Sequence, residues 1–151
     1  MGDISSKKDY RDISLAARDR AAAESGRVVV IPHGGLLFID LDDDNHRGRL
    51  EHRLDLLGAL GIYTDRLGVW SSPTPGHYHA CVRLRGATPD DGTRIGLQTA
   101  LGGDSLAALF QYARLLAGIQ PPCSMFESEQ KAIELQSWGA TVHYPAAEAQ
   151  S

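Results

Sequence analysis

Leu36-Leu37-Phe38-Ile39-Asp40-Leu41-Asp42 is the stretch that decides the fold, because it has the pattern of an apolar strand that ends in alternating carboxylates. Successive side chains of a strand point to opposite faces, so we expect Asp40 and Asp42 on one face and Ile39 and Leu41 on the other. A pair of carboxylates on one face is suited to holding divalent cations against a triphosphate. The stretch therefore predicts a sheet with a candidate metal site at one end.

A second informative stretch is a loop followed by a strand. Two prolines and a glycine in Ser71-Ser72-Pro73-Thr74-Pro75-Gly76 exclude regular structure and predict the loop. From His77 to Arg85, apolar and polar residues alternate, which predicts a strand with one apolar face. The polar positions of this strand are His77, His79, Cys81, Arg83 and Arg85.

The remaining segments predict helices and short strands. An Ala-rich helix is expected over residues 5–25, ending at Gly26. Residues 28–31 and 36–41 are apolar runs separated by Pro32-His33-Gly34-Gly35, which predicts a β-hairpin. Further along, we expect an amphipathic helix through Leu50, Leu54, Leu57 and Leu60, a strand over 67–70, helices over 88–101 and 104–117, an edge strand over 123–126 and a helix over 130–138. This order predicts an α+β fold with helices on one face of a sheet.

Length and composition predict a soluble protein of one domain. The chain has 151 residues, of which 42% are hydrophobic and 23% charged, and no run approaches the roughly 18 apolar residues of a membrane span. The start of the chain has no secretory pattern, and Cys81 and Cys123 form no close metal-binding pair. We therefore expect a cytoplasmic protein that does not contact a membrane.

The charge of the chain is unevenly distributed. The net charge of −4 argues against binding nucleic acid by bulk attraction. Between residues 47 and 114, however, eight arginines stand against six acidic residues, and the segment contains no lysine. Arginine suits phosphate recognition, although a bias toward arginine codons explains the same count.

Three segments of the chain, in order, resemble motifs of the archaeo-eukaryotic primase superfamily, the primase-polymerases. The strand ending in Asp40 and Asp42 resembles the first motif, and the loop and strand from Ser71 to Val82, with His79 as the matching histidine, resemble the second. The third segment has Gln98, then Leu101-Gly102-Gly103-Asp104, and then Arg114. It is similar to a stretch of mobile-element primases, and the whole resemblance is nearest to plasmid and phage replication primases.

The resemblance implies a fold, an activity and a set of site residues. The fold would be a mostly antiparallel, RRM-like sheet with helices packed on one face. The activity would be metal-dependent nucleotidyl transfer on a single-stranded DNA template, with Mg²⁺ or Mn²⁺ as cofactor. Asp40, Asp42 and Asp104 would be the catalytic, metal-binding acids. The nucleotide-binding residues would be Gly76, His77, His79, Arg83 and Arg114.

The resemblance also implies an organisation and partners. Residues 1–26 would be an N-terminal helical segment, residues 27–127 the primase-like core, and residues 128–151 a C-terminal extension whose end is disordered. The partners would be single-stranded DNA, nucleoside triphosphates and a separate helicase or replication initiator of a mobile element.

Each site residue also has a structural explanation. Asp40 and Asp42, followed by the acidic run Asp43-Asp44-Asn45, fit a strand that ends in a solvent-exposed loop. His79 fits a partly buried histidine of a sheet. Asp104 fits the N-cap of a helix that begins at Ser105, and Arg114 fits an exposed position on that helix.

Two other functions remain open. His77-Tyr78-His79 is a His-hydrophobic-His triplet of the kind that replication-initiator nucleases and relaxases use to bind one metal ion, with a downstream tyrosine, here Tyr112, attacking DNA. The third possibility is a noncatalytic nucleic-acid-binding module that displays arginines on a sheet.

Overall fold

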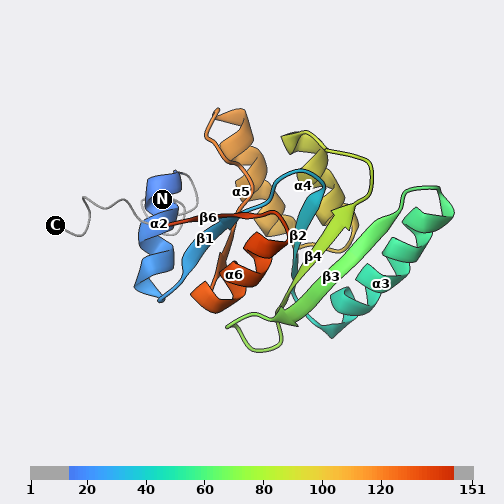
Figure 1. Ribbon diagram of the computed structural model, residues 1–151, viewed down its shortest axis with the longest axis horizontal. Coiled ribbons are helices and arrows are strands. Elements are labelled where there is room, and N and C mark those ends of the chain that lie inside the picture. Colours follow the sequence, from blue (N-terminus) through green and yellow to red (C-terminus); the bar gives the residue numbers. More distant parts are fainter. Residues whose placement is uncertain (1–13, 145–151) are drawn as a thin grey trace, which may run out of the picture. The chain divides into compact units, whose positions relative to one another are not determined.

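The computed structural model describes residues 14–144, and these have the predicted α+β fold with antiparallel strands. The strands form two three-stranded sheets, however, where the sequence predicted one sheet. The chain divides into two compact units. Figure 1 labels their helices and strands. One unit comprises His33–Leu109, and the other combines the segment up to Pro32 with the segment from Phe110 onward.

The unit of residues 33–109 is built on a sheet in which the central strand pairs with both neighbours. Its elements are β2 Leu36–Leu41, α3 Asp44–Ala59, β3 Thr64–Ser71, β4 Tyr78–Leu84 and α4 Asp91–Ala100. Helix α5 Ser105–Leu116 begins in this unit. The strand order is β2-β4-β3 with antiparallel neighbours, so β2 and β3 run in the same direction and α3 connects them. This is a split βαβ arrangement.

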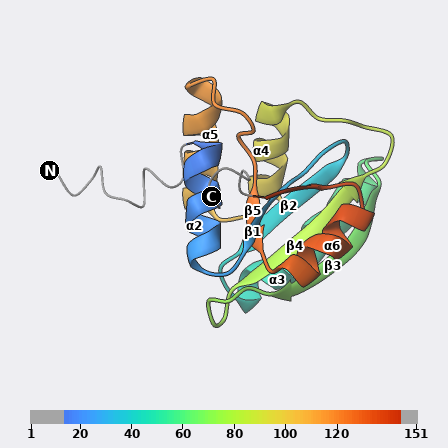
Figure 2. The ribbon, with the colours of Figure 1, turned by 60° about the vertical axis from the view of Figure 1, so that its left-hand side comes forward.

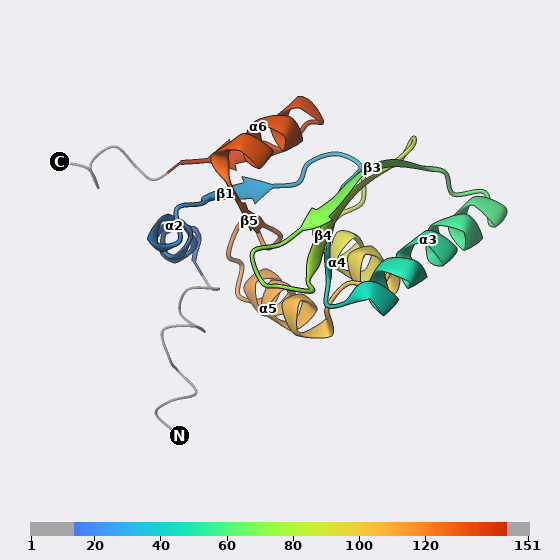
Figure 3. The ribbon, with the colours of Figure 1, turned by 90° about the horizontal axis from the view of Figure 1, so that it is seen from below.

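One face of this sheet forms the hydrophobic core. The alternation of β2 places Leu37, Ile39 and Leu41 on that face, where they are completely or almost completely buried. They pack with Ala80, Val82 and Leu84 of β4, with Leu50 and Leu54 of α3, and with Leu101 after α4. Figure 3 shows α3 and α4 on the same side of the sheet. Helices on one face were therefore predicted correctly for this unit.

Helix α3 begins earlier than the leucine spacing indicated. Asp43 caps it by accepting a hydrogen bond from the backbone N–H of His46 at 2.9 Å. The acidic run after β2 is therefore a cap and the first turn of a helix, so the prediction of a loop there was wrong. At the other end, Leu60 is 77% exposed and does not belong to the core.

The second unit joins segments from both ends of the chain. It contains α2 Leu15–Glu24, β1 Val28–Ile31, the C-terminal part of α5, β5 Met125–Glu127, α6 Glu129–Ser137 and β6 Thr141–His143. The strand order is β5-β1-β6, with antiparallel neighbours. Helix α2 packs beside β1, as Figure 2 shows, where Ala22, Val29 and Ile31 form a small core.

The predicted hairpin between residues 28–31 and 36–41 is wrong. Strand β1 has a partner on each side, β5 and β6, whereas β2 pairs with β4 in the other sheet. Gly35 shows why the chain does not turn back on itself: its carbonyl accepts from the N–H of Leu84, and a Cβ at this position would lie 2.4 Å from the Leu84 oxygen. The chain after Pro32 is therefore held against β4.

The remaining predictions for the C-terminal part were mostly correct. The edge strand and the following helix appear as β5 and α6, but β6 was not predicted. Residues 5–13 of the predicted N-terminal helix, and the end of the C-terminal extension, for which we predicted disorder, lie outside the described part of the chain. Within residues 14–144, no helix has both the length and the apolar character needed to cross a membrane.

Candidate functional site

The two carboxylates of β2 face two histidines of β4. Asp40 lies directly opposite His79 in the strand register, with 3.8 Å between Asp40 Oδ1 and His79 Nε2. Two residues after Asp40, Asp42 has its Oδ1 atom 3.6 Å from His77 Nδ1. Because residues two positions apart share a face of a strand, all four side chains lie on the face of the sheet opposite the hydrophobic core. The sequence predicted the shared face of the acids but not the pairing of each acid with a histidine.

Asp104 joins this group from a segment far along the chain. Its backbone N–H donates to the carbonyl oxygen of Asp40 at 2.9 Å. Its carboxylate accepts from the N–H groups of Leu106 and Ala107, at 3.3 and 3.2 Å, in the first turn of α5. Asp104 therefore caps α5 and also lies beside Asp40, so one residue fits both interpretations of the sequence.

Two glycines make this approach possible. Gly102 has a φ of 116°, a value that side-chain-bearing residues rarely adopt. A Cβ at Gly103 would lie 2.6 Å from the backbone oxygen of Gln98. The turn from α4 into α5 therefore needs glycine at both positions to place Asp104 on β2.

The acids perturb one another electrostatically. Burial raises the pKa of Asp40, the charge of His79 lowers it in part, and the charges of Asp104 and Asp42 raise it again. Burial also raises the pKa of Asp42, as do the charge of Asp104 and a side-chain hydrogen bond with it. Carboxylates that influence one another in this way form a concentration of negative charge that a cation would relieve.

His79 is held by its neighbours on both sides. It is 8% exposed, and its ring meets the ring of Trp70 edge to face, with 6.3 Å between centroids and 85° between planes. Trp70 lies opposite His79 in the register of β3 and β4. Trp70, His79 and Asp40 thus form a row across the three strands. The sequence predicted only a strand over 67–70, because the partner of Trp70 depends on the register of β3 against β4.

The residues predicted to bind nucleotide do not all lie in this cluster. Gly76, with a φ of 80°, lies at the end of the loop before β4. Two backbone hydrogen bonds close this loop: the N–H of Ser72 donates to the oxygen of His77, and the N–H of His77 donates to the oxygen of Thr74. Arg83 lies four residues from His79 on the same strand, which is about 13 Å along it.

The two predicted residues of α5 belong to the other unit. Arg114 is 5% exposed, and its Nε donates a hydrogen bond to the carbonyl oxygen of Pro122 at 2.8 Å. The expectation that Arg114 occupies an exposed position on the helix was therefore wrong. Tyr112, the tyrosine of the nuclease hypothesis, is 38% exposed.

The donor chemistry of the three acids fits a hard divalent cation, since Mg²⁺ and Mn²⁺ prefer carboxylate oxygen ligands. Three carboxylates supply such oxygens here. Asp40 and Asp42 lie two residues apart in the sequence, and the backbone of Asp104 is hydrogen-bonded to that of Asp40. Over residues 14–144, no group of three or more His, Cys, Asp or Glu side chains is already arranged to hold an ion. Binding one ion through all three acids therefore requires their side chains to rotate from the arrangement seen here.

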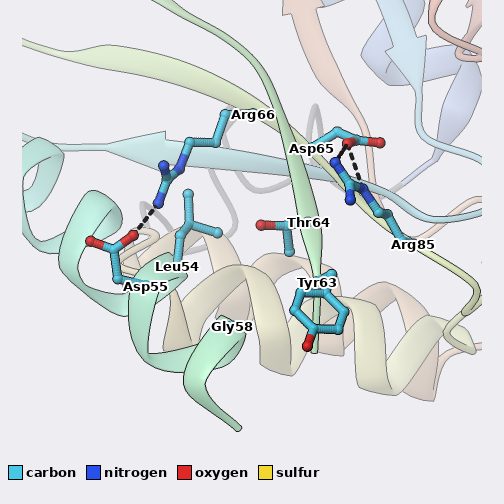
Figure 4. Close-up of a pocket in the computed structure, with 8 residues that line it drawn as sticks. All are labelled: Leu54, Asp55, Gly58, Tyr63, Thr64, Asp65, Arg66 and Arg85. Atoms are coloured by element: carbon cyan, nitrogen blue, oxygen red, sulfur yellow. Dashed lines mark hydrogen bonds and ion pairs between the residues drawn. The ribbon is translucent and has the colours of Figure 1, made fainter. Parts of the chain in front are cut away.

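A pocket with a volume of about 500 Å³ lies elsewhere on this unit, between the end of α3 and the start of β3 (Figure 4). Its charged residues pair within it: Arg66 with Asp55 and Arg85 with Asp65, each at 2.6 Å. None of the predicted site residues lines it.

Comparison with known proteins gives no relative for this chain. No protein-family model matches it, and no curated protein or solved structure is significantly similar to it.

Proposed function

We propose that the protein is a metal-dependent nucleotidyltransferase of the primase-polymerase type, which makes or extends strands on single-stranded DNA. The observation that carries the proposal is the position of Asp104. It lies 62 residues after Asp42 in the sequence, yet its backbone is hydrogen-bonded to Asp40 and its carboxyl group interacts with Asp42. A structural cap of α5 needs no such neighbours, whereas a cation site needs several carboxylates together.

The residues of the cluster have separate roles in this proposal. Asp40, Asp42 and Asp104 would hold Mg²⁺ or Mn²⁺. When bound, the cations would neutralise charge on the transferring α-phosphoryl group and activate the attacking 3′-hydroxyl. His79, fixed between Trp70 and Asp40, would donate a hydrogen bond to a phosphate oxygen of the incoming nucleotide.

The neighbouring loop has a supporting role. His77 lies beside Asp42, at the end of the loop that Gly76 closes. The lack of a side chain at Gly76 leaves the backbone there open to an approaching phosphate. We propose that the partners are a single-stranded DNA template, nucleoside triphosphates and a separate helicase or replication initiator, in the cytoplasm of the host of a mobile element.

The test is incorporation of labelled nucleotides by the purified protein on primed and unprimed single-stranded DNA, with Mg²⁺ or Mn²⁺. Asp40→Asn and Asp42→Asn should each reduce incorporation by at least about 100-fold, because a neutral amide is a weaker ligand than a carboxylate for a hard cation and does not balance its charge. Asp65→Asn is the matched control. It removes the same charge from a residue that pairs with Arg85 and is not part of the cluster, so it should leave incorporation unchanged.

Other outcomes would favour the other functions. A covalent protein–DNA adduct that is lost in Tyr112→Phe would identify a nuclease. DNA binding that persists in both acid variants, without incorporation by the wild type, would identify a noncatalytic module.

A further inference from the structure

Gln98 occupies a position from which it contacts both segments that carry the acids. It lies in the last turn of α4 and is 4% exposed. Its side-chain Oε1 accepts a hydrogen bond from the backbone N–H of Phe38 at 2.9 Å. Its backbone oxygen accepts from the N–H of Gly103 at 3.0 Å. One residue thus connects β2 to the turn between α4 and α5.

These two contacts belong to a closed set of hydrogen bonds. Phe38 precedes Asp40 by two residues on β2, and Gly103 directly precedes Asp104. The third side is the hydrogen bond from the Asp104 N–H to the Asp40 oxygen. The close approach of Gly103 to the Gln98 oxygen leaves no room for a Cβ, so the turn is held against the helix end. A buried side chain that accepts from a strand N–H fixes the distance between helix and strand.

We infer that Gln98 is a positioning residue, which sets the distance of the Asp104 carboxylate from Asp40 and Asp42 and thereby the affinity of the site for a divalent cation. The inference rests on the proposed function for the identity of the cation site. Gln98 itself would touch neither the cation nor the nucleotide. It would act through Phe38 and Gly103.

The chain offers matched variants for the test. Gln98→Met keeps the length of the side chain and removes its acceptor, whereas Gln98→Glu keeps an oxygen acceptor at the same place. Thr99→Val is the control: it removes a side-chain hydrogen bond within the same helix, from Thr99 Oγ1 to Ile95 O, that makes no contact with β2. All variants are made in the full chain, and their stability is measured by urea unfolding.

Two measurements decide the inference. The first is the affinity for Mn²⁺ alone, by titration calorimetry or electron paramagnetic resonance. The second is hydrogen exchange of the Asp104 amide by NMR, without metal. We expect Gln98→Met to bind Mn²⁺ about 10-fold more weakly than the wild type and to exchange the Asp104 amide faster. Gln98→Glu should restore most of the affinity, and Thr99→Val should match the wild type in both.

The possible failures can be separated. Equal Mn²⁺ affinity of wild type and Gln98→Met overturns the inference, and so does an equal loss in Gln98→Met and Thr99→Val, which would report only a weakened helix. The expected pattern of affinities in a protein that incorporates no nucleotide supports the inference and contradicts the proposed function. A wild type that binds no Mn²⁺ overturns both.

Discussion

The ionised carboxylate of Asp40 destabilises the folded protein. Burial is the largest cause that raises the pKa of its carboxyl group, and the carboxylates of Asp104 and Asp42 raise it further. The charges of His79 and His77 lower the pKa only in part, so it stays above its ordinary value. A group that is easier to protonate in the folded protein than in the unfolded chain weakens the fold once it is ionised. Residues kept in such surroundings are characteristic of functional sites.

This residue gives a prediction for pH dependence. The folded protein holds the Asp40 proton more tightly than the unfolded chain, so stability falls as pH rises from the ordinary aspartate range, near 4, through the raised pKa. Asp40→Asn removes this loss. We expect the variant to be more stable than the wild type in urea unfolding at pH 7.5, and the difference to shrink at pH 4.

Asp90→Asn is the control of opposite sign. The N–H of Thr93 donates to the Asp90 carboxylate at 2.7 Å, and this hydrogen bond lowers the pKa of Asp90. Its charged form therefore stabilises the fold at neutral pH, and that contribution is lost as pH falls through the lowered pKa. Asp90→Asn should be less stable than the wild type at pH 7.5. A loss of stability in Asp40→Asn at pH 7.5 would contradict the interpretation of Asp40.

At the scale of elements, α4 closes the edge of a strand. Strand β2 is the outer strand of its sheet, and a free edge leaves backbone groups unpaired. Three of these groups find partners in or just after α4: Arg94 donates to the oxygen of Leu36, Gln98 accepts from Phe38, and the Asp104 N–H donates to Asp40. Arg94 also donates to the oxygen of Gly34, just before the strand. An RRM-like sheet has four strands, whereas this sheet has three and α4 lines its edge.

Arg94 supplies the test of this edge. It is 6% exposed, and its guanidinium donates to two backbone oxygens. Hydrogen bonds that involve a charged group each contribute roughly 1.5 to 3 kcal/mol, so Arg94→Leu should lower the free energy of unfolding by about 3 kcal/mol. Arg85→Leu removes an exposed arginine that pairs with Asp65 and should change stability by less than about 1 kcal/mol. The free energy of unfolding of both variants is measured by urea unfolding. Equal losses in Arg94→Leu and Arg85→Leu would contradict the role of Arg94 at the edge of β2.

The elements also show how far the sequence predicted the site. The alternation in β2 and β4 was visible along the chain, because period-two patterns are local, and it correctly placed Asp40 with Asp42 on one face and His77 with His79 on one face. The pairing of β2 with β4 was not visible, because about 35 residues and a third strand separate them. The role of Gln98 had no local signal, since its partner Phe38 lies 60 residues away.

At the scale of the whole molecule, the two units differ in how far apart their paired segments lie along the chain. The unit that carries the acid–histidine cluster is one continuous segment, His33–Leu109. The other unit brings β1 together with β5 and β6, which are more than 90 residues further along. The sequence suggested a local hairpin because a turn signal separates residues 28–31 from residues 36–41, whereas no local pattern indicates partners so far along the chain.

The C-terminal strand β6 contributes two contacts to this second unit. It covers one edge of β1, whose four residues are at most 8% exposed, and His143 Nδ1 lies 2.9 Å from Asp19 Oδ1 on α2. A chain that ends at Ala140 lacks both contacts. We expect the amides of Val29 to Ile31 to lose most of their protection from hydrogen exchange, because a four-residue strand then has a partner on one side only. A chain that ends at Tyr144 keeps β6 and serves as the control. Equal protection of these amides in the two shortened chains would show that β5 and α2 alone suffice to hold β1.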